Sequence, residues 1–257
     1  MKLHPTAVVD PGAQLAEGVE VGPYAVINSD VIIGPGTQIM AHAYIDRYTT
    51  IGSGCRIFPS TSVGAVPQDL KFRGEKTEVI IGDDVTIREF VTVHRGTGQS
   101  GRTTVGDGAL LMAYVHVAHD CHVGRGVIAA NNLAMGGHVT IEDEAYIGGL
   151  VAIHQFARVG THAFIGGFSR VSKDMPPYLI GEGAVDFTLH GPNTIGLKRK
   201  GFPPETIEAL KEAFRMIFRN RRPLQEVLEE TSAAFAQVPE VRTLVEFMRT
   251  SERGVYR

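Results

Sequence analysis

A period of six residues is the feature that most constrains the fold of this 257-residue chain. Stepping by six from Leu3 to Val171 meets an apolar side chain at 26 of 29 positions, and small side chains recur four residues after the apolar ones. This period matches neither the roughly 3.6 of an amphipathic helix nor the roughly 2 of a half-buried strand. A short fixed period predicts a solenoid, and hexapeptide repeats are typical of a parallel β-helix.

The predicted fold class is therefore mainly β, with a hexapeptide-repeat β-helix over residues 1–177. Each hexapeptide would supply one short strand and a corner, three would close a triangular coil of 18 residues, and neighbouring coils would pair at about 4.8 Å. Two polar stretches interrupt the repeat, and we expect them to form loops near 66–78 and 97–104. Pro176 and Pro177 end the pattern.

Residues 178–257 are expected to form a connecting segment and a C-terminal α-helical domain. Apolar residues recur at helical spacing after Pro203, and further helices are predicted after Pro223 and Pro239. From His190 to Arg257 the chain carries 12 Lys and Arg against 9 Asp and Glu, although the whole chain has a formal charge of −3. The helical end is therefore the basic end.

Composition and motifs indicate the compartment in which the protein works and the types of catalysis for which it lacks residues. Two cysteines suggest no disulfide framework, and the start of the chain lacks the apolar stretch of a signal peptide, so we expect a cytoplasmic protein. No apolar run approaches the roughly 18 residues of a membrane span, and the net negative charge gives no reason to expect a nucleic-acid partner. There is no Gly-x-Ser-x-Gly elbow or phosphate-binding loop, and no cofactor is expected.

The densest group of reactive side chains runs from His116 to His122. Because residues 18 apart stack on adjacent coils, His119 is predicted to lie under Gly137, which lies under Gln155, and Asp120 under His138. A neutral imidazole can take a proton from a hydroxyl, a carboxylate can orient it, and a glycine N–H can stabilise an oxyanion. We therefore predict His119 as a general base, Asp120 as its partner and Gly137 as an oxyanion donor.

Cys121 is the alternative nucleophile in this stretch. It falls in the column of small inward side chains, as Cys55 does, so packing is the stronger interpretation.

Several motifs resemble those of the UDP-N-acetylglucosamine O-acyltransferase family, which acts in lipid A synthesis: Pro67 to Glu75, His94-Arg95-Gly96-Thr97, Ala118 to Cys121, Gly136-Gly137-His138, His154-Gln155-Phe156 and Gly196 to Phe202. The resemblance covers essentially the whole chain. It implies a left-handed β-helix and a homotrimer with active sites between subunits. The implied reaction moves a 3-hydroxyacyl group from acyl carrier protein to the 3-hydroxyl of UDP-N-acetylglucosamine, with no metal or cofactor.

The resemblance also assigns residues. His119 matches the family's general base and Gly137 its oxyanion donor, while Asn193 and Arg199 match the nucleotide end of the site and Gly167 the end of the acyl groove. Most of the remaining predicted substrate-binding residues lie in the shared motifs, namely Gln68, Asp69, Lys71, His138, His154 and Gln155. The last one, His116, lies two residues before the motif that begins at Ala118. The basic residues before the second helix, Arg221 and Arg222 among them, would then dock the acidic carrier protein.

Alternatives stay open at this point. Ile195 stands where the family commonly has an acidic residue, so the acceptor could instead be a 3-amino analogue of the sugar nucleotide. His116, His119 and His122 could bind zinc, as in the γ-type carbonic anhydrases that share this type of β-helix. Those enzymes generally lack the basic tail and the Gln-Asp-Leu-Lys loop, which favours acyl transfer. A non-catalytic β-helix would explain the repeat but not the histidines.

Overall fold

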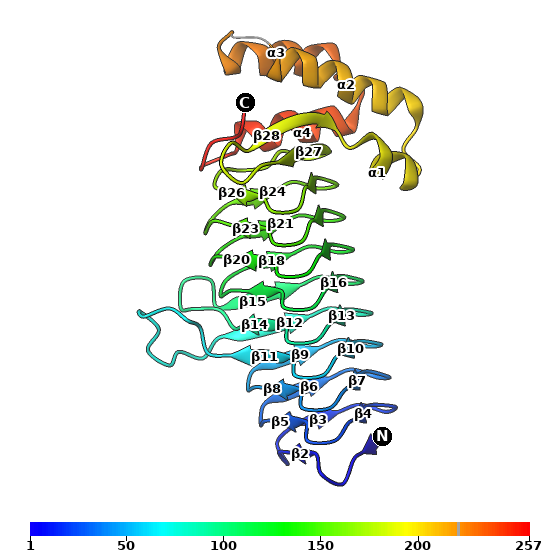
Figure 1. Ribbon diagram of the computed structural model, residues 1–257, viewed down its shortest axis with the longest axis vertical. Helices are drawn as coiled ribbons and strands as arrows, with labels where there is room; N and C mark the ends of the chain where they lie inside the picture. Colours follow the sequence, from blue (N-terminus) through cyan, green and yellow to red (C-terminus); the bar gives the residue numbers. More distant parts are fainter. Residues whose placement is uncertain (220–221) are drawn as a thin grey trace.

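Three parallel sheets wind around one apolar core and form an upright three-sided prism, with helices stacked on its C-terminal end (Figure 1). The computed structural model describes residues 1–219 and 222–257. Each coil adds one short strand to each sheet, and neighbouring coils pair in parallel register, as Val117 does with Val93. The chain is a left-handed parallel β-helix with a C-terminal helical domain, which confirms the predicted fold class.

The first face of the prism is an 11-stranded sheet. It contains β1 (Lys2–Leu3), β4 (Glu20–Val21), β7 (Gln38–Ile39), β10 (Arg56–Ile57), β13 (Thr86–Ile87), β16 (Leu110–Leu111), β19 (Ile128–Ala129), β22 (Tyr146–Ile147), β25 (Phe164–Ile165), β27 (Leu179–Glu182) and β28 (Thr188–Pro192). The last two strands form an antiparallel pair that extends this face beyond the repeat.

The second and third faces have nine and eight strands. The second contains β2 (Val8–Val9), β5 (Val26–Ile27), β8 (Tyr44–Ile45), β11 (Ser62–Ala65), β14 (Thr92–His94), β17 (His116–Val117), β20 (Ala134–Met135), β23 (Ala152–Ile153) and β26 (Arg170–Val171). The third contains β3 (Gln14–Leu15), β6 (Val31–Ile33), β9 (Thr49–Ile51), β12 (Glu78–Ile81), β15 (Arg102–Val105), β18 (His122–Val123), β21 (Thr140–Ile141) and β24 (Arg158–Val159).

The two columns of the repeat fill the interior. Aliphatic side chains such as Val117 and Ile147 are fully buried, and small side chains of the other column, such as Ala43, are buried as well. Cys55 and Cys121 are buried in the small column, and both are free thiols. Because strand positions alternate between inside and outside, the residue before each buried aliphatic position faces outward.

Both interruptions of the repeat leave the prism at one edge, where the second face turns into the third. The longer loop runs between β11 and β12 and projects sideways from the prism (Figure 1). It starts at a bulge where Gly64 has a φ of +88°, and a side chain there would collide with Thr49. The shorter loop runs between β14 and β15. Arg102 already belongs to β15, so this loop ends earlier than the expected 97–104.

The C-terminal region has four helices among its described residues: α1 (Thr194–Arg199), α2 (Pro204–Phe218), α3 (Leu224–Ala234) and α4 (Pro239–Arg249). The sequence predicted three of them; α1 is too short for its periodicity to be visible. Apolar faces of the longer helices form a second core that includes Leu210, Leu228 and Leu244. The C-terminal end of the chain is attached to the prism, because the Tyr256 hydroxyl accepts a hydrogen bond from the Ser172 N–H at 2.6 Å. None of the described helices is long and apolar enough to cross a bilayer.

Candidate active site

Successive corners between the second and third faces stack three pairs of residues above one another. We call this the His119 edge; it consists of residues 119–120, 137–138 and 155–156. The His138 N–H donates to the His119 carbonyl at 3.1 Å, and the Phe156 N–H donates to the Gly137 carbonyl at 3.0 Å. The column His119, Gly137, Gln155 therefore forms as the 18-residue spacing predicts.

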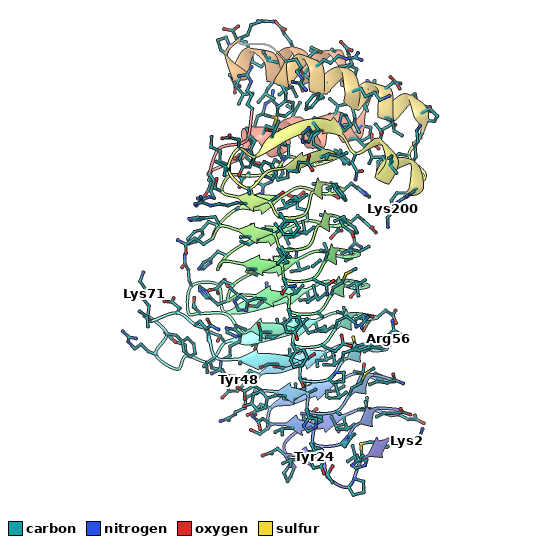
Figure 2. The ribbon with its side chains drawn as sticks, viewed as in Figure 1. Lys2, Tyr24, Tyr48, Arg56, Lys71 and Lys200 are labelled. Carbon is teal, nitrogen blue, oxygen red and sulfur yellow. The ribbon has the colours of Figure 1, made fainter. Side chains whose placement is uncertain are left out.

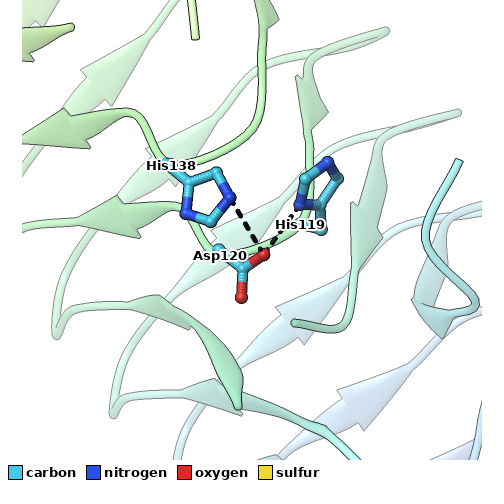
Figure 3. A group of neighbouring side chains, drawn as sticks. All are labelled: His119, Asp120 and His138. Carbon is cyan, nitrogen blue, oxygen red and sulfur yellow. Dashed lines mark hydrogen bonds and ion pairs between the residues drawn. The ribbon is translucent and has the colours of Figure 1, made fainter. Parts of the chain in front are cut away.

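His119 and Asp120 form a close pair at this edge (Figure 3). His119 Nδ1 lies 2.7 Å from Asp120 Oδ2, and His138 Nε2 lies 3.5 Å from the same oxygen. The Asp120 side chain is fully buried, whereas that of His119 is 18% exposed. With Nδ1 bonded to the carboxylate, the neutral imidazole keeps its proton on Nδ1 and presents the lone pair of Nε2.

The shorter loop holds the Asp120 carboxylate from the other side. Oδ1 accepts the Thr97 N–H at 2.9 Å and the Ser100 hydroxyl, and Oδ2 accepts the Thr97 hydroxyl at 2.7 Å. Burial raises the pKa of Asp120, but the hydrogen bonds from Ser100, His119 and Thr97 outweigh it, so that the pKa lies below its ordinary value.

The hexapeptide pattern does not predict that Thr97 and Ser100 contact Asp120. It predicts only that their segment is a loop that leaves the scaffold. The signal that could have found them is position, because the loop interrupts the repeat at the corner that lies directly below residues 119–120.

Gly137 lies against the His119 ring. A β-carbon at this position would come within 2.7 Å of His119 Nε2 and closer still to Cε1, so a side chain fits only if the ring moves. The Gly137 N–H donates to no acceptor within the described residues. The residue that packs against Nε2, the nitrogen that can accept a proton, therefore also carries a free N–H.

The other predicted residues of this edge surround the pair. His116 points outward from β17, and its Nδ1 lies 2.7 Å from the Thr92 hydroxyl. Burial lowers the pKa of His138, although the charges of Asp120 and Asp69 oppose the shift. On the next coil His154 and Gln155 are exposed, and His154 Nδ1 bonds the Gln155 carbonyl.

The longer loop carries the predicted residues Gln68, Asp69 and Lys71. Asp69 Oδ1 accepts the Lys71 N–H at 2.9 Å in a local turn, and the Lys71 side chain extends from the outer end of the loop (Figure 2). Gln68 and Lys71 are exposed. The loop therefore presents an amide, a carboxylate and an ammonium group beside the His119 edge.

Three predicted residues lie elsewhere in the same chain. Gly167 sits between β25 and β26, at the edge that joins the first and second faces. Asn193 caps α1, because its Oδ1 accepts the Gly196 N–H, and its amide donates to the His162 carbonyl on the edge between the third and first faces. Arg199 is exposed at the end of α1. Lys200, the next residue, lies across the molecule from Lys71 (Figure 2).

The three histidines of the zinc alternative, in which the metal lies between subunits, do not converge within the described residues of one chain. His122 lies on the third face and bonds Thr104, while His116 lies on the second. Within the described residues, the group that could hold a metal ion is instead His119, Asp120 and His138.

Comparisons with known proteins agree with this architecture over the full chain. Residues 24–59 match the family of bacterial transferase hexapeptide repeats, and residues 174–256 match domain 2 of UDP-N-acetylglucosamine O-acyltransferase. The acyl-[acyl-carrier-protein]–UDP-N-acetylglucosamine O-acyltransferase of Thermodesulfovibrio yellowstonii is 46% identical over 257 residues, covering 100% of this chain and 99% of that protein. The chain belongs to the UDP-N-acetylglucosamine O-acyltransferase family.

Solved structures of the family superpose closely. The UDP-N-acetylglucosamine acyltransferase of Bacteroides fragilis has a TM-score of 0.97 at 44% identity, with 99% of both chains covered. The O-acyltransferase of Moraxella catarrhalis has a TM-score of 0.96 at 39% identity over 100% of both chains. Family membership confirms the resemblance that the motifs indicated.

Proposed function

We propose that the chain transfers a 3-hydroxyacyl group from acyl carrier protein to the 3-hydroxyl of UDP-N-acetylglucosamine, the first step of lipid A synthesis, in the cytoplasm. The observation that carries the proposal is the geometry at His119. Its Nδ1 is bonded to a buried carboxylate, and its Nε2 packs against Gly137, whose N–H has no acceptor among the described residues. A general base next to an oxyanion donor suits acyl transfer.

In the proposed mechanism His119 Nε2 takes the proton of the sugar hydroxyl as its oxygen attacks the thioester carbonyl. The carbonyl oxygen becomes an oxyanion that accepts the Gly137 N–H, and Asp120 stabilises the imidazolium. The intermediate then collapses, the carbon–sulfur bond breaks, and the imidazolium returns the proton to the departing thiolate. The products are the acylated sugar nucleotide and the free carrier thiol.

Substrate binding follows from the polar groups around this pair. We assign the sugar and diphosphate to Gln68, Asp69, Lys71, His116, His138, His154 and Gln155, with the Lys71 ammonium suited to the diphosphate. Asn193 and Arg199 would serve the nucleotide and Gly167 the acyl chain. Since the Asn193 side chain caps α1, its contribution to nucleotide binding would be to place the helix that carries Arg199.

The proposed active form is a homotrimer. His119, Gly167 and α1 belong to three different edges of one prism. A single site that uses all three must therefore combine edges from neighbouring chains.

The test is to incubate the protein with UDP-N-acetylglucosamine and a panel of 3-hydroxyacyl carrier proteins and to identify products by mass. The 3-amino analogue of the sugar nucleotide is a second acceptor in the same panel, because Ile195 is 63% exposed where the family commonly has an acid. An O-acylated product with the plain sugar is the expected result; product with neither acceptor would contradict the proposal.

The first variant to measure is His119→Ala. Loss of a general base typically lowers the rate by about 10² to 10⁴. His122→Ala is the matched control, because this histidine is exposed on the third face and should keep its wild-type kcat. A folded His119→Ala protein with near wild-type kcat would rule out the assignment.

A further inference from the structure

The shorter loop, residues 95–101, makes an unusual set of contacts for a surface connection. It presents two hydroxyls and one backbone N–H to a single carboxylate, that of Asp120. Thr97 is itself only 7% exposed. The hydroxyls of Thr97 and Ser100 are therefore directed inward, at the partner of the proposed general base.

We propose that Thr97 and Ser100 are positioning residues, which act on His119 through Asp120 by holding its carboxylate ionised and aimed at His119 Nδ1. This inference deepens the proposed function and rests on it. Among the described residues neither hydroxyl hydrogen-bonds the His119 ring, so their effect is carried by the carboxylate between them.

The geometry explains how the carboxylate is aimed. Oδ1 is held by the Thr97 N–H and the Ser100 hydroxyl, and this leaves Oδ2 to face His119 and His138. The Thr97 hydroxyl donates to Oδ2 as well. The Asp120 backbone is fixed separately, because its N–H donates to the Thr103 hydroxyl at 2.9 Å.

The same contacts explain why the carboxylate stays charged. A buried carboxylate without donors takes up a proton. The titratable side chains that face Asp120 are His119 from its own corner and His138 from the next coil, while the loop supplies uncharged donors. Without the hydroxyls, a protonated Asp120 would lose its preference for accepting the His119 Nδ1–H.

The experiment compares the double variant Thr97→Val/Ser100→Ala with the hydroxyl-retaining pair Thr97→Ser and Ser100→Thr. Thr37→Val is the matched control, since it removes a buried hydroxyl that bonds the Gly52 carbonyl far below the site. Turnover is measured with the acyl donor that the wild type uses. Nuclear magnetic resonance of the folded proteins reports the Asp120 carboxyl titration and the neutral tautomer of His119, whether or not turnover is seen.

We expect the double variant to lose about tenfold or more in kcat, with both KM values changed less than threefold, because a hydrogen bond to a charged group is lost at each position. Its Asp120 carboxyl should titrate at higher pH than in the wild type, and the share of His119 with the proton on Nδ1 should fall. The hydroxyl-retaining variants and Thr37→Val should match the wild type.

An Asp120 titration and a His119 tautomer that stay unchanged in the double variant would overturn the inference, even if kcat fell. A changed titration with unchanged kcat would overturn it too. The Asp120 titration and the His119 tautomer do not depend on which acceptor is used. Failure of the proposed function would show itself differently, as absence of acylated product in the wild type.

Discussion

At the scale of single residues, the proposed site depends on the closeness of Gly137 to the His119 ring. The corner position itself is available to other residue types, because the equivalent position one coil above holds Gln155. What excludes a side chain at 137 is the imidazole, which occupies the space where a β-carbon would lie. The residue type at position 137 therefore depends on the histidine at position 119.

We predict that Gly137→Ala lowers kcat strongly while the protein still folds. The methyl group of the alanine would lie 2.7 Å from His119 Nε2. The imidazole ring must therefore rotate away from the sugar substrate or away from Asp120. A displacement of this size typically costs about 10²-fold in rate. Gly12→Ala is the control, because its methyl group would meet Asp10 at a tolerable 3.2 Å in the first coil. Equal kcat in the two variants would remove Gly137 from the mechanism.

At the scale of elements, the corner between β25 and β26 carries Gly167, the proposed end of the acyl groove. Gly167 is exposed, and a β-carbon there would meet the Gly149 carbonyl at 3.2 Å, which a small shift can absorb. A larger side chain should therefore require only a small local shift and project outward from the edge. With glycine present, the groove is expected to admit longer acyl chains.

We predict that Gly167→Met shifts the donor preference towards shorter 3-hydroxyacyl chains. Forcing a long chain past the new side chain would cost roughly 1 to 3 kcal/mol, as overpacking does. The measurement is kcat/KM across the carrier-protein panel, with Gly12→Met as a control of similar crowding. A chain-length profile equal to that of the control would place the end of the groove elsewhere.

At the scale of the whole molecule, buried histidines link stability to pH. Burial, followed by the neighbouring His116 and His119, lowers the pKa of His94 from 6.5 to about 4. The unfolded chain then binds a proton at a higher pH than the folded chain. The stability gained from a neutral His94 is therefore complete above about pH 6.5 and is lost as the pH falls towards 4.

We predict that the free energy of unfolding falls by about 2 kcal/mol more in the wild type than in His94→Phe when the pH drops from 7.5 to 5. Phenylalanine suits the site because His94 Nδ1 is buried and has no hydrogen-bond partner among the described residues. Urea unfolding at a fixed protein concentration measures the difference. Parallel pH dependence in the two proteins would show that His94 does not titrate as expected.

The basic helical end gives a second prediction at this scale, for carrier-protein docking. Opposite charges speed association, and salt screens them over about 8 Å at physiological ionic strength. Of the two residues singled out in the sequence, Arg221 lies outside the described residues. Arg222 is exposed and already pairs with Glu226 and Glu230, so reversing Arg222 alone also disturbs that local pairing.

We predict that KM for the acyl carrier protein rises with salt and in Arg221→Glu/Arg222→Glu, whereas KM for the sugar nucleotide changes little in that variant. Lys2→Glu, at the opposite end of the prism, is the charge-reversal control (Figure 2). A carrier KM that responds equally to both variants, or to neither, would move the docking site away from the helices.

The sequence by itself determined the β-helix and the stacking of Gly137 on His119. Three repeats of six residues make one coil, so residues 18 apart in the sequence lie above one another. Only the tertiary structure decided the contacts of segments outside the repeat. Thr97 and Ser100 meet Asp120 because a loop outside the repeat folds back on its own edge. The Asn193 side chain caps α1. This helix is too short for its periodicity to show in the sequence. Loops and caps are positioned by contacts distant in sequence, and no local pattern encodes these.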